Sequence, residues 1–183
     1  MYEIFGEFDS AEELNLCAAG LKAERDKDNL LILAKENGID ESLATMYLEG
    51  TTQTFIDIFG AMCGKLEVER KEGKTGIAPA QAIIDYLSIT GFEKEELAIA
   101  IRRKGKSLEK CCEEITKAAK EIAAPEIEKE IQKRRQGNQK PTNAPGSFGQ
   151  QTVNIPDLTV FKMAETYYLR QEDISNDNSI QSV

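Results

Sequence analysis

The sequence predicts an all-α protein, built as a small helical bundle with an interrupted C-terminal helical module and a mobile loop. Apolar residues recur at helical spacing along most of the chain, and capping and stop signals separate the resulting segments. No stretch alternates polar and apolar residues convincingly as a strand does, and only residues 151–155 are compatible with a short extended piece. A length of 183 residues is sufficient for one domain or two small ones with a real core.

The first three helices are predicted by the residues at their ends. The segment Ser10-Ala-Glu-Glu13 is a capping box, in which two side chains satisfy free N–H groups at a helix start. A second helix is expected over residues 27–36, because the pair Asn37-Gly38 is a strong stop signal and glycine readily adopts the left-handed conformation. Asp40 then caps a short third helix that ends at Gly50.

The later helices are delimited mainly by threonine, glycine and proline. Thr51 or Thr52 is expected to start the fourth helix, which leads into a turn-rich linker over residues 71–76. Pro79 suits the first turn of the next helix, which continues to Gly91. The last three helices are expected over residues 93–104, 107–123 and 156–171, with Gly105 and Pro125 as stops.

The composition of residues 136–151, which are rich in Gly, Asn, Gln and Pro, predicts a mobile loop. These boundaries divide the chain into an acidic N-terminal helical domain over residues 1–70 and a second helical domain over residues 77–173. A disordered insertion is expected at about 125–151 inside the second domain, and a flexible tail over residues 174–183.

The residue types that most catalytic sites require are missing or badly spaced. Without histidine the chain cannot form Ser-His or Cys-His pairs, zinc-deaminase sites or HExxH sites. The four cysteines lack metal-ligand spacing, because adjacent Cys111 and Cys112 project about 100° apart on a helix. We therefore expect no enzyme activity, no cofactor and no metal. The N-terminus lacks a secretory signal pattern and no run is long enough to span a membrane, so we expect a cytoplasmic protein of a bacterial host cell.

The net charge of −9 is concentrated in residues 1–70, which carry 15 acidic and 6 basic side chains. An acidic surface repels phosphate backbones and attracts basic grooves. The alternative is a solvated acidic surface that only aids solubility.

Residues 30–50 resemble a helix-turn-helix, with Gly38 in the turn and the small Ala34 allowing a close helix crossing. The positions expected to be exposed on the second helix are acidic or short, and they offer no Arg, Lys, Gln or Asn to a DNA groove. A helical corner used only for packing is therefore the preferred interpretation. The exposed positions are Asp40, Glu41, Ser42, Thr45 and Glu49.

A basic turn precedes the helix expected at residue 107, formed by Arg102, Arg103, Lys104 and Lys106. Such a turn at a helix N-terminus can hold phosphate, which makes these residues candidates for nucleic-acid contact. The alternative is a solvated helix end whose cations favour the dipole of the preceding helix.

Residues 93–173 resemble a known family through two segments. The first is Lys104-Gly-Lys-Ser-Leu-Glu-Lys-Cys-Cys112, followed by an Ala/Lys-rich helix. The second is Val160-Phe-Lys-Met-Ala-Glu-Thr-Tyr-Tyr-Leu169, followed by Glu172-Asp173. This order is similar to the PcfK-like family, in which an aromatic residue, Ala and Tyr-Tyr precede acidic residues. Residues 8–50 also resemble a lead-in found on proteins from the same mobile elements.

The resemblance implies a small helical protein encoded on conjugative elements and phages of Gram-positive gut bacteria. Family members include anti-CRISPR proteins, which bind and inhibit the type II RNA-guided DNA nuclease and block DNA binding or cleavage. The expected partner is that nuclease, with or without its guide RNA, and nucleic acid is a secondary candidate. The alternative is a helix-turn-helix DNA-binding regulator of the element. The candidate partner contacts are Glu12, Glu13, Asp40, Glu41, Glu49, Asp57, Tyr167 and Tyr168.

Overall fold

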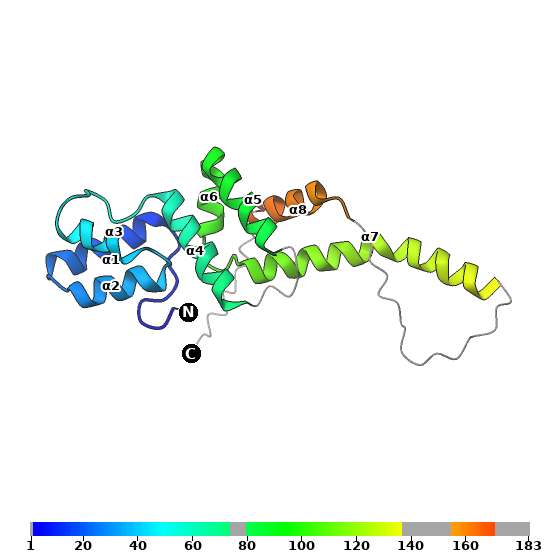
Figure 1. Ribbon diagram of the computed structural model, residues 1–183, viewed down its shortest axis with the longest axis horizontal. Helices are drawn as coiled ribbons and strands as arrows, with labels where there is room; N and C mark the ends of the chain where they lie inside the picture. Colours follow the sequence, from blue (N-terminus) through cyan, green and yellow to red (C-terminus); the bar gives the residue numbers. More distant parts are fainter. Residues whose placement is uncertain (1, 74–79, 137–154, 171–183) are drawn as a thin grey trace, which may run out of the picture.

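The computed structural model describes residues 2–73, 80–136 and 155–170, apart from several side chains near the end of the longest helix. This part of the chain contains eight helices and no strand, which confirms the all-α prediction (Figure 1). The helices are α1 (Ala11–Ala23), α2 (Lys27–Glu36), α3 (Glu41–Leu48), α4 (Ile58–Glu72), α5 (Ala80–Glu93), α6 (Glu95–Arg102), α7 (Leu108–Gln136) and α8 (Asp157–Leu169).

The ends of the first three helices follow their sequence signals. The Ser10 hydroxyl accepts a hydrogen bond from the Glu13 N–H at the start of α1, and Asp40 caps α3 through the Ser42 N–H. Gly38 and Gly50 both have positive φ, at 66° and 77°, as expected for glycine that ends a helix. The predictions for α1, α2 and α3 are therefore confirmed.

The predicted start of the fourth helix at Thr51 or Thr52 is wrong, because α4 begins after Asp57. The Asn15 side chain of α1 accepts hydrogen bonds from the Phe55 and Ile56 N–H groups and donates one to the Ile56 carbonyl. These backbone groups are therefore bound to α1 and cannot join a helical ladder. Asp57 takes the capping role, and its Oδ1 atom accepts from the Gly60 N–H at 2.7 Å.

The predicted stop at Pro125 is also wrong, because Pro125 lies inside α7, a helix of 29 residues. Proline removes one helical hydrogen bond, which leaves the Glu121 carbonyl without its usual donor. Both residues are exposed, so water can bind that carbonyl. The helix thus covers the first part of the predicted insertion, while residues 137–151 and the predicted tail lie outside the described residues.

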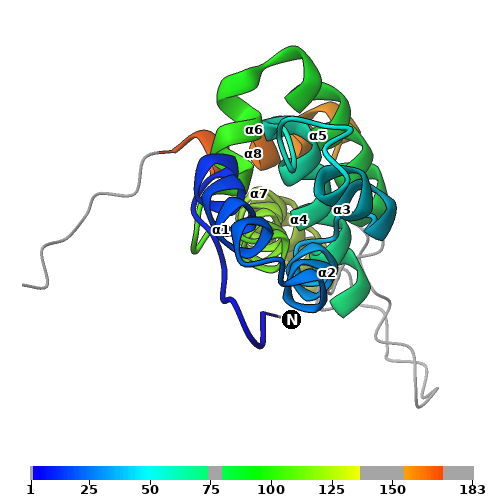
Figure 2. The same ribbon diagram turned by 90° about the vertical axis from the view of Figure 1, so that its left-hand side faces the viewer.

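Apolar side chains form two clusters, and α4 contributes to both. The first cluster lies among α1, α2 and α3 and includes Ala61 of α4. The second lies among α4, α5, α6, α7 and α8 and includes Met62 and Leu66 of α4. Figures 1 and 2 show α4 between the first three helices and the later ones. The two predicted domains therefore share this helix.

The corner between α2 and α3 packs directly on the backbone of α4. A Cβ atom at Gly38 would lie 2.3 Å from the Gly64 carbonyl oxygen, and a Cβ at Gly64 would lie 2.2 Å from the Asn37 carbonyl oxygen. Only glycine at both positions permits this approach. The glycine of the helix-turn-helix-like segment thus has a packing role in this fold.

We expect Gly64→Ala to destabilise the protein by about 3 kcal/mol, because neither backbone can move away from the added methyl group without disturbing its helix. Gly20→Ala is the matched control, since Gly20 also lies inside a helix but a Cβ there has no neighbour within 4 Å. That variant should stabilise the protein by about 0.5–1 kcal/mol. Chemical denaturation measures both changes, and similar small effects at the two positions would contradict the close packing.

Candidate interaction surface

The described residues do not form a metal site. They contain no group of three or more His, Cys, Asp or Glu side chains that could hold a metal ion. Burial raises the pKa of the Cys112 thiol to about 11, and it raises the pKa of Cys111 well above its ordinary value. Both thiols therefore stay protonated at neutral pH and are poor nucleophiles. None of the helices in the described ranges combines the length and apolar character that a membrane span requires.

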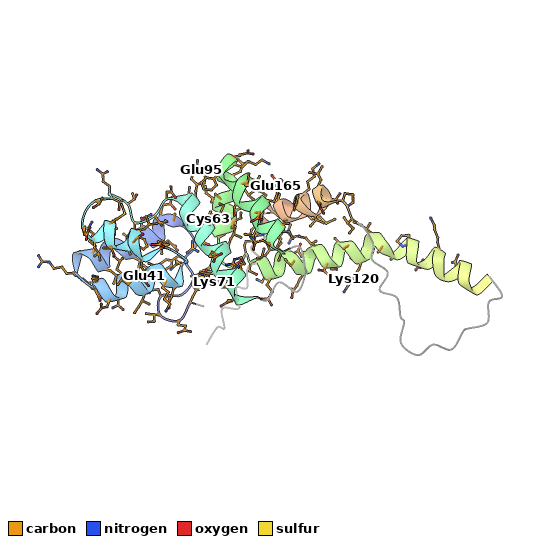
Figure 3. The ribbon with its side chains drawn as sticks, in the orientation of Figure 1. Glu41, Cys63, Lys71, Glu95, Lys120 and Glu165 are labelled. Atoms are coloured by element: carbon orange, nitrogen blue, oxygen red, sulfur yellow. The ribbon has the colours of Figure 1, made fainter. Side chains whose placement is uncertain are left out.

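Three predicted contact residues are exposed on α3 and at its two caps, and we call them the α3 acidic surface: Asp40, Glu41 and Glu49. Figure 3 shows Glu41 among the first three helices, and its side chain is exposed. Hydrogen bonds from Ser42 lower the pKa of the Asp40 carboxyl, so this group remains charged at neutral pH. The chain has no basic residue between Lys35 and Lys65. Within this stretch of sequence no basic side chain neutralises the α3 acidic surface. The nearby Lys22 of α1 lies against the end of α3, where its Nζ atom donates a hydrogen bond to the Tyr47 carbonyl and stands over the Tyr47 ring.

The other three predicted acidic contacts lie where α1 meets the start of α4. Glu12 and Glu13 are exposed in the first turn of α1, and Glu13 also accepts a hydrogen bond from the Asp9 N–H at 2.9 Å. Asp57 is exposed and caps α4. The hydrogen bonds between Asn15 and Ile56 hold Asp57 beside the turn of α1 that follows Glu12. The structure therefore brings these acidic groups to one junction.

The two predicted aromatic contacts are not available to a partner. Tyr167 and Tyr168 are only 4% and 1% exposed, and both belong to the second apolar cluster. The Tyr167 hydroxyl accepts a hydrogen bond from the Ser107 N–H at 3.1 Å, which holds α8 against the start of α7. The prediction that these tyrosines anchor a partner is therefore wrong, and their role is to dock α8.

Two of the four residues proposed for nucleic-acid contact are also buried. Arg102 is 0% exposed, and its Nη2 atom donates to Asn37 Oδ1 at 2.8 Å. Lys106 is 4% exposed, and its Nζ atom donates to the carbonyls of Tyr167 and Arg170 at 3.0 Å. These contacts remove Arg102 and Lys106 from any nucleic-acid interface. Arg103 and Lys104 remain exposed.

The N-terminus of α7 does not offer the phosphate site that the basic turn suggested. Glu69 Oε2 accepts a hydrogen bond from the Leu108 N–H at 2.7 Å, inside the protein. A carboxylate of the chain itself therefore occupies the position that a phosphate would take at this helix end.

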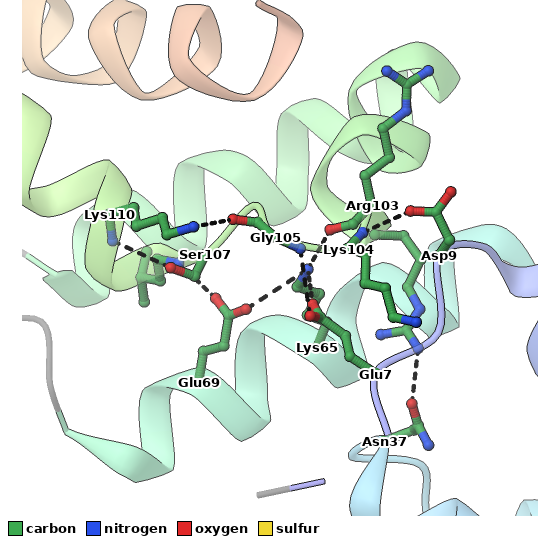
Figure 4. Close-up of polar contacts among 12 residues, drawn as sticks. Glu7, Asp9, Asn37, Lys65, Glu69, Arg103, Lys104, Gly105, Ser107 and Lys110 are labelled. Carbon is green, nitrogen blue, oxygen red and sulfur yellow. Dashed lines mark hydrogen bonds and ion pairs between the residues drawn. The ribbon is translucent and has the colours of Figure 1, made fainter. Parts of the chain in front are cut away.

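The same carboxylate belongs to a buried polar cluster that joins distant parts of the chain (Figure 4). Its centre is Lys65, a fully buried residue of α4. The Lys65 Nζ atom lies 2.7 Å from Glu7 Oε1, 2.6 Å from the Arg103 carbonyl and 3.9 Å from Glu69 Oε1. Asp9 accepts a further bond from the Lys104 N–H at 2.8 Å. The N-terminal segment, α4 and the turn before α7 are thereby tied together.

Burial dominates the electrostatics of this cluster. It raises the pKa of Glu69 to about 7, although Lys65 and the Leu108 N–H both favour the charged form. It lowers the pKa of Lys65 against the opposing effect of Glu7 and Glu69. Sequence reasoning missed this pair, although a signal for it exists: Lys65 and Glu69 follow Ala61 and Met62 at helical spacing, on the face that becomes the core.

The raised pKa of Glu69 predicts a specific dependence of stability on pH. Between about pH 4.5 and 7 the folded protein binds this proton more tightly than the unfolded chain does. The contribution of protonated Glu69 to the stability of the folded protein is therefore complete below pH 4.5 and is lost as the pH rises through 7. In Glu69→Gln the side chain cannot titrate but can still accept from the Leu108 N–H. Between about pH 5 and pH 7.5, thermal melts should show a smaller loss of Tm for Glu69→Gln than for the wild type. An equal loss in both proteins would show that titration of Glu69 does not contribute to the pH dependence of stability.

Comparison with models of protein families finds no match for this chain. Comparisons with curated proteins and with solved structures find no match either. The PcfK-like resemblance therefore stays a prediction from the sequence.

Proposed function

We propose that this protein acts by binding, as an anti-CRISPR inhibitor of a type II RNA-guided DNA nuclease. The observation that carries the proposal is the exposed α3 acidic surface, in a stretch of chain without a single basic residue. The resemblance to the PcfK-like family supplies the class of target.

Charge complementarity provides a mechanism for such inhibition. RNA-guided nucleases hold their guide and target strands in positively charged channels, and they read a short motif of the DNA with arginine side chains. Carboxylates at Asp40, Glu41 and Glu49 can occupy the place of phosphates or of guanine acceptors in such a channel. The inhibitor then competes with DNA for the same cations. Because these groups are exposed, the attraction is screened over about 10 Å at 0.1 M salt.

The alternative of a DNA-binding regulator lacks comparable support. In the α2–α3 corner the second helix would have to approach DNA with its exposed side, where Asp40, Glu41 and Glu49 would meet phosphates of like charge. The close contact of Gly38 with Gly64 gives this corner a packing role without DNA.

The proposal predicts that the double variant Glu41→Lys/Glu49→Lys loses most of its inhibition of DNA cleavage by a guide-loaded type II nuclease. Reversing two contact charges should raise the concentration needed for half-inhibition by about tenfold or more, as is typical when charges at an interface are made alike. The wild-type protein should also inhibit less at higher salt. Cleavage of a labelled duplex measures both effects.

The matched control is Glu113→Lys/Glu121→Lys, which makes the same change of charge at exposed positions of α7. This variant should inhibit as the wild type does, and circular dichroism should show that both variants are folded. Equal inhibition by all three proteins would exclude the α3 acidic surface as the contact. Normal cleavage by several type II nucleases at saturating wild-type protein would reject the proposed function.

A further inference from the structure

A second surface of the molecule carries exposed aromatic side chains, at the seam between α4 and α5. The rings of Phe59 and Phe92 stack across the seam, with centroids 5.1 Å apart and planes inclined by 18°. Phe92 is 60% exposed, and Ile89, three residues earlier on the same face of α5, is 64% exposed. We call these three residues the seam patch.

The seam beneath this patch is well packed, so the aromatic rings are held in place. One turn from the stacked rings, Ser88 of α5 lies beside the Cys63 thiol of α4, where it opposes the rise in the thiol pKa that burial causes. Figure 3 shows Cys63 on α4 where the helices of the second cluster meet. Phe59 also packs against the second apolar cluster. The patch is thus a fixed apolar surface with one side toward solvent.

A neighbouring aromatic pair shows that exposure is not a general property of stacked rings in this fold. Tyr86 and Phe161 stack with centroids 4.7 Å apart between α5 and α8, and both side chains are half-buried against the second cluster. Single exposed apolar residues are ordinary on protein surfaces, whereas an apolar group surrounded by polar residues often marks an interaction site. Phe92 and Ile89 form such a group with Phe59.

The surroundings of the patch are acidic. Asp85 and Glu93 lie one turn before and one turn after Ile89 on α5, and Asp57 lies two residues before Phe59. All three are exposed. Neither α5 nor the first seven residues of α4, 58–64, contains a lysine or an arginine. The nearby Lys94 is paired with Glu165 of α8. The patch therefore combines an aromatic centre with uncompensated negative charge.

We propose that the seam patch docks a basic amphipathic segment of a partner protein. Such a segment presents one or two apolar side chains to Phe59, Ile89 and Phe92, and lysines or arginines to the acidic residues around them. A second copy of this chain is disfavoured as the occupant, because two acidic surroundings would face each other. The inference goes beyond the proposed function, because it concerns a different surface and does not require the nuclease.

The chain contains no tryptophan, which provides a direct test. The variant Phe92→Trp places one fluorescent side chain in the patch and keeps its aromatic character. The probe is a synthetic 18-residue helix made only of leucine and lysine at amphipathic spacing, compared with a leucine and glutamate version. The lysine peptide should shift the tryptophan emission of the Phe92→Trp variant to shorter wavelength, and the glutamate peptide should not. Ile122→Trp, at a half-exposed position of α7, should show no shift.

Truncation of the patch then measures its contribution. Calorimetry should show that Phe92→Ala and Ile89→Ala each bind the lysine peptide roughly tenfold or more weakly than the wild type, as expected for a binding hot spot. Ile122→Ala is the matched control and should bind normally. The proposal would be overturned if Phe92→Ala bound the lysine peptide as tightly as the wild type does. It would also be overturned if only Glu41→Lys/Glu49→Lys, and no variant of the seam patch, weakened binding of that peptide. Sedimentation showing a wild-type dimer that Phe92→Ala dissociates would also overturn it, in favour of a second copy.

The two proposals can fail separately. Peptide binding at the patch together with normal nuclease cleavage would retain this inference and reject the proposed function. Nuclease inhibition with no peptide binding at the patch would retain the proposed function and reject this inference.

Discussion

The buried ammonium of Lys65 is the constraint on which the arrangement of this protein depends. A charge inside a protein is tolerated only when it is paired and hydrogen-bonded, because removing it from water costs several kcal/mol. Glu7, Glu69 and the Arg103 carbonyl supply those partners from three separate parts of the chain. The N-terminal segment must therefore lie across α4, and the turn between α6 and α7 must approach it. Glu69 then extends the constraint to the first N–H of α7.

Close backbone packing supports the same junction from the other side. Gly38 and Gly64 let the α2–α3 corner approach α4, and this approach places Asn37 where its Oδ1 atom accepts from the buried Arg102. With both apolar clusters built on α4, the remaining acidic side chains of α3 and of the α4–α5 seam are left on the outside. The polar interior and the acidic exterior thus follow from one set of contacts.

Local signals predict the parts of the fold that local interactions determine. The caps and glycine stops of α1, α2 and α3 involve residues within a few positions of each other, and the structure confirms them. The predicted start of α4 is wrong because Asn15, some forty residues away, binds the backbone that a local pattern assigns to a helix. Pro125 fails as a stop because an exposed helix can lose one hydrogen bond to water.

The candidate site is harder to predict than the fold, for a related reason. Exposure of Asp40, Glu41 and Glu49 follows from the helical pattern, so the sequence places these positions correctly on the surface. Burial of Arg102, Lys106 and Tyr167 depends on distant partners that no spacing in the sequence reveals. The exposure of Phe92 is not predictable in this way, because a sequence pattern does not distinguish an apolar residue that faces the core from one that faces a partner.

We propose that this protein works by presenting acidic surface to a basic partner, and hydrogen exchange of the complex tests this proposal most directly. The protein would be measured alone and with an excess of guide-loaded type II nuclease. The account predicts slower exchange of backbone amides in α3 when the nuclease is present, with the outer part of α7 unchanged. No change anywhere, or protection confined to α7, would contradict it.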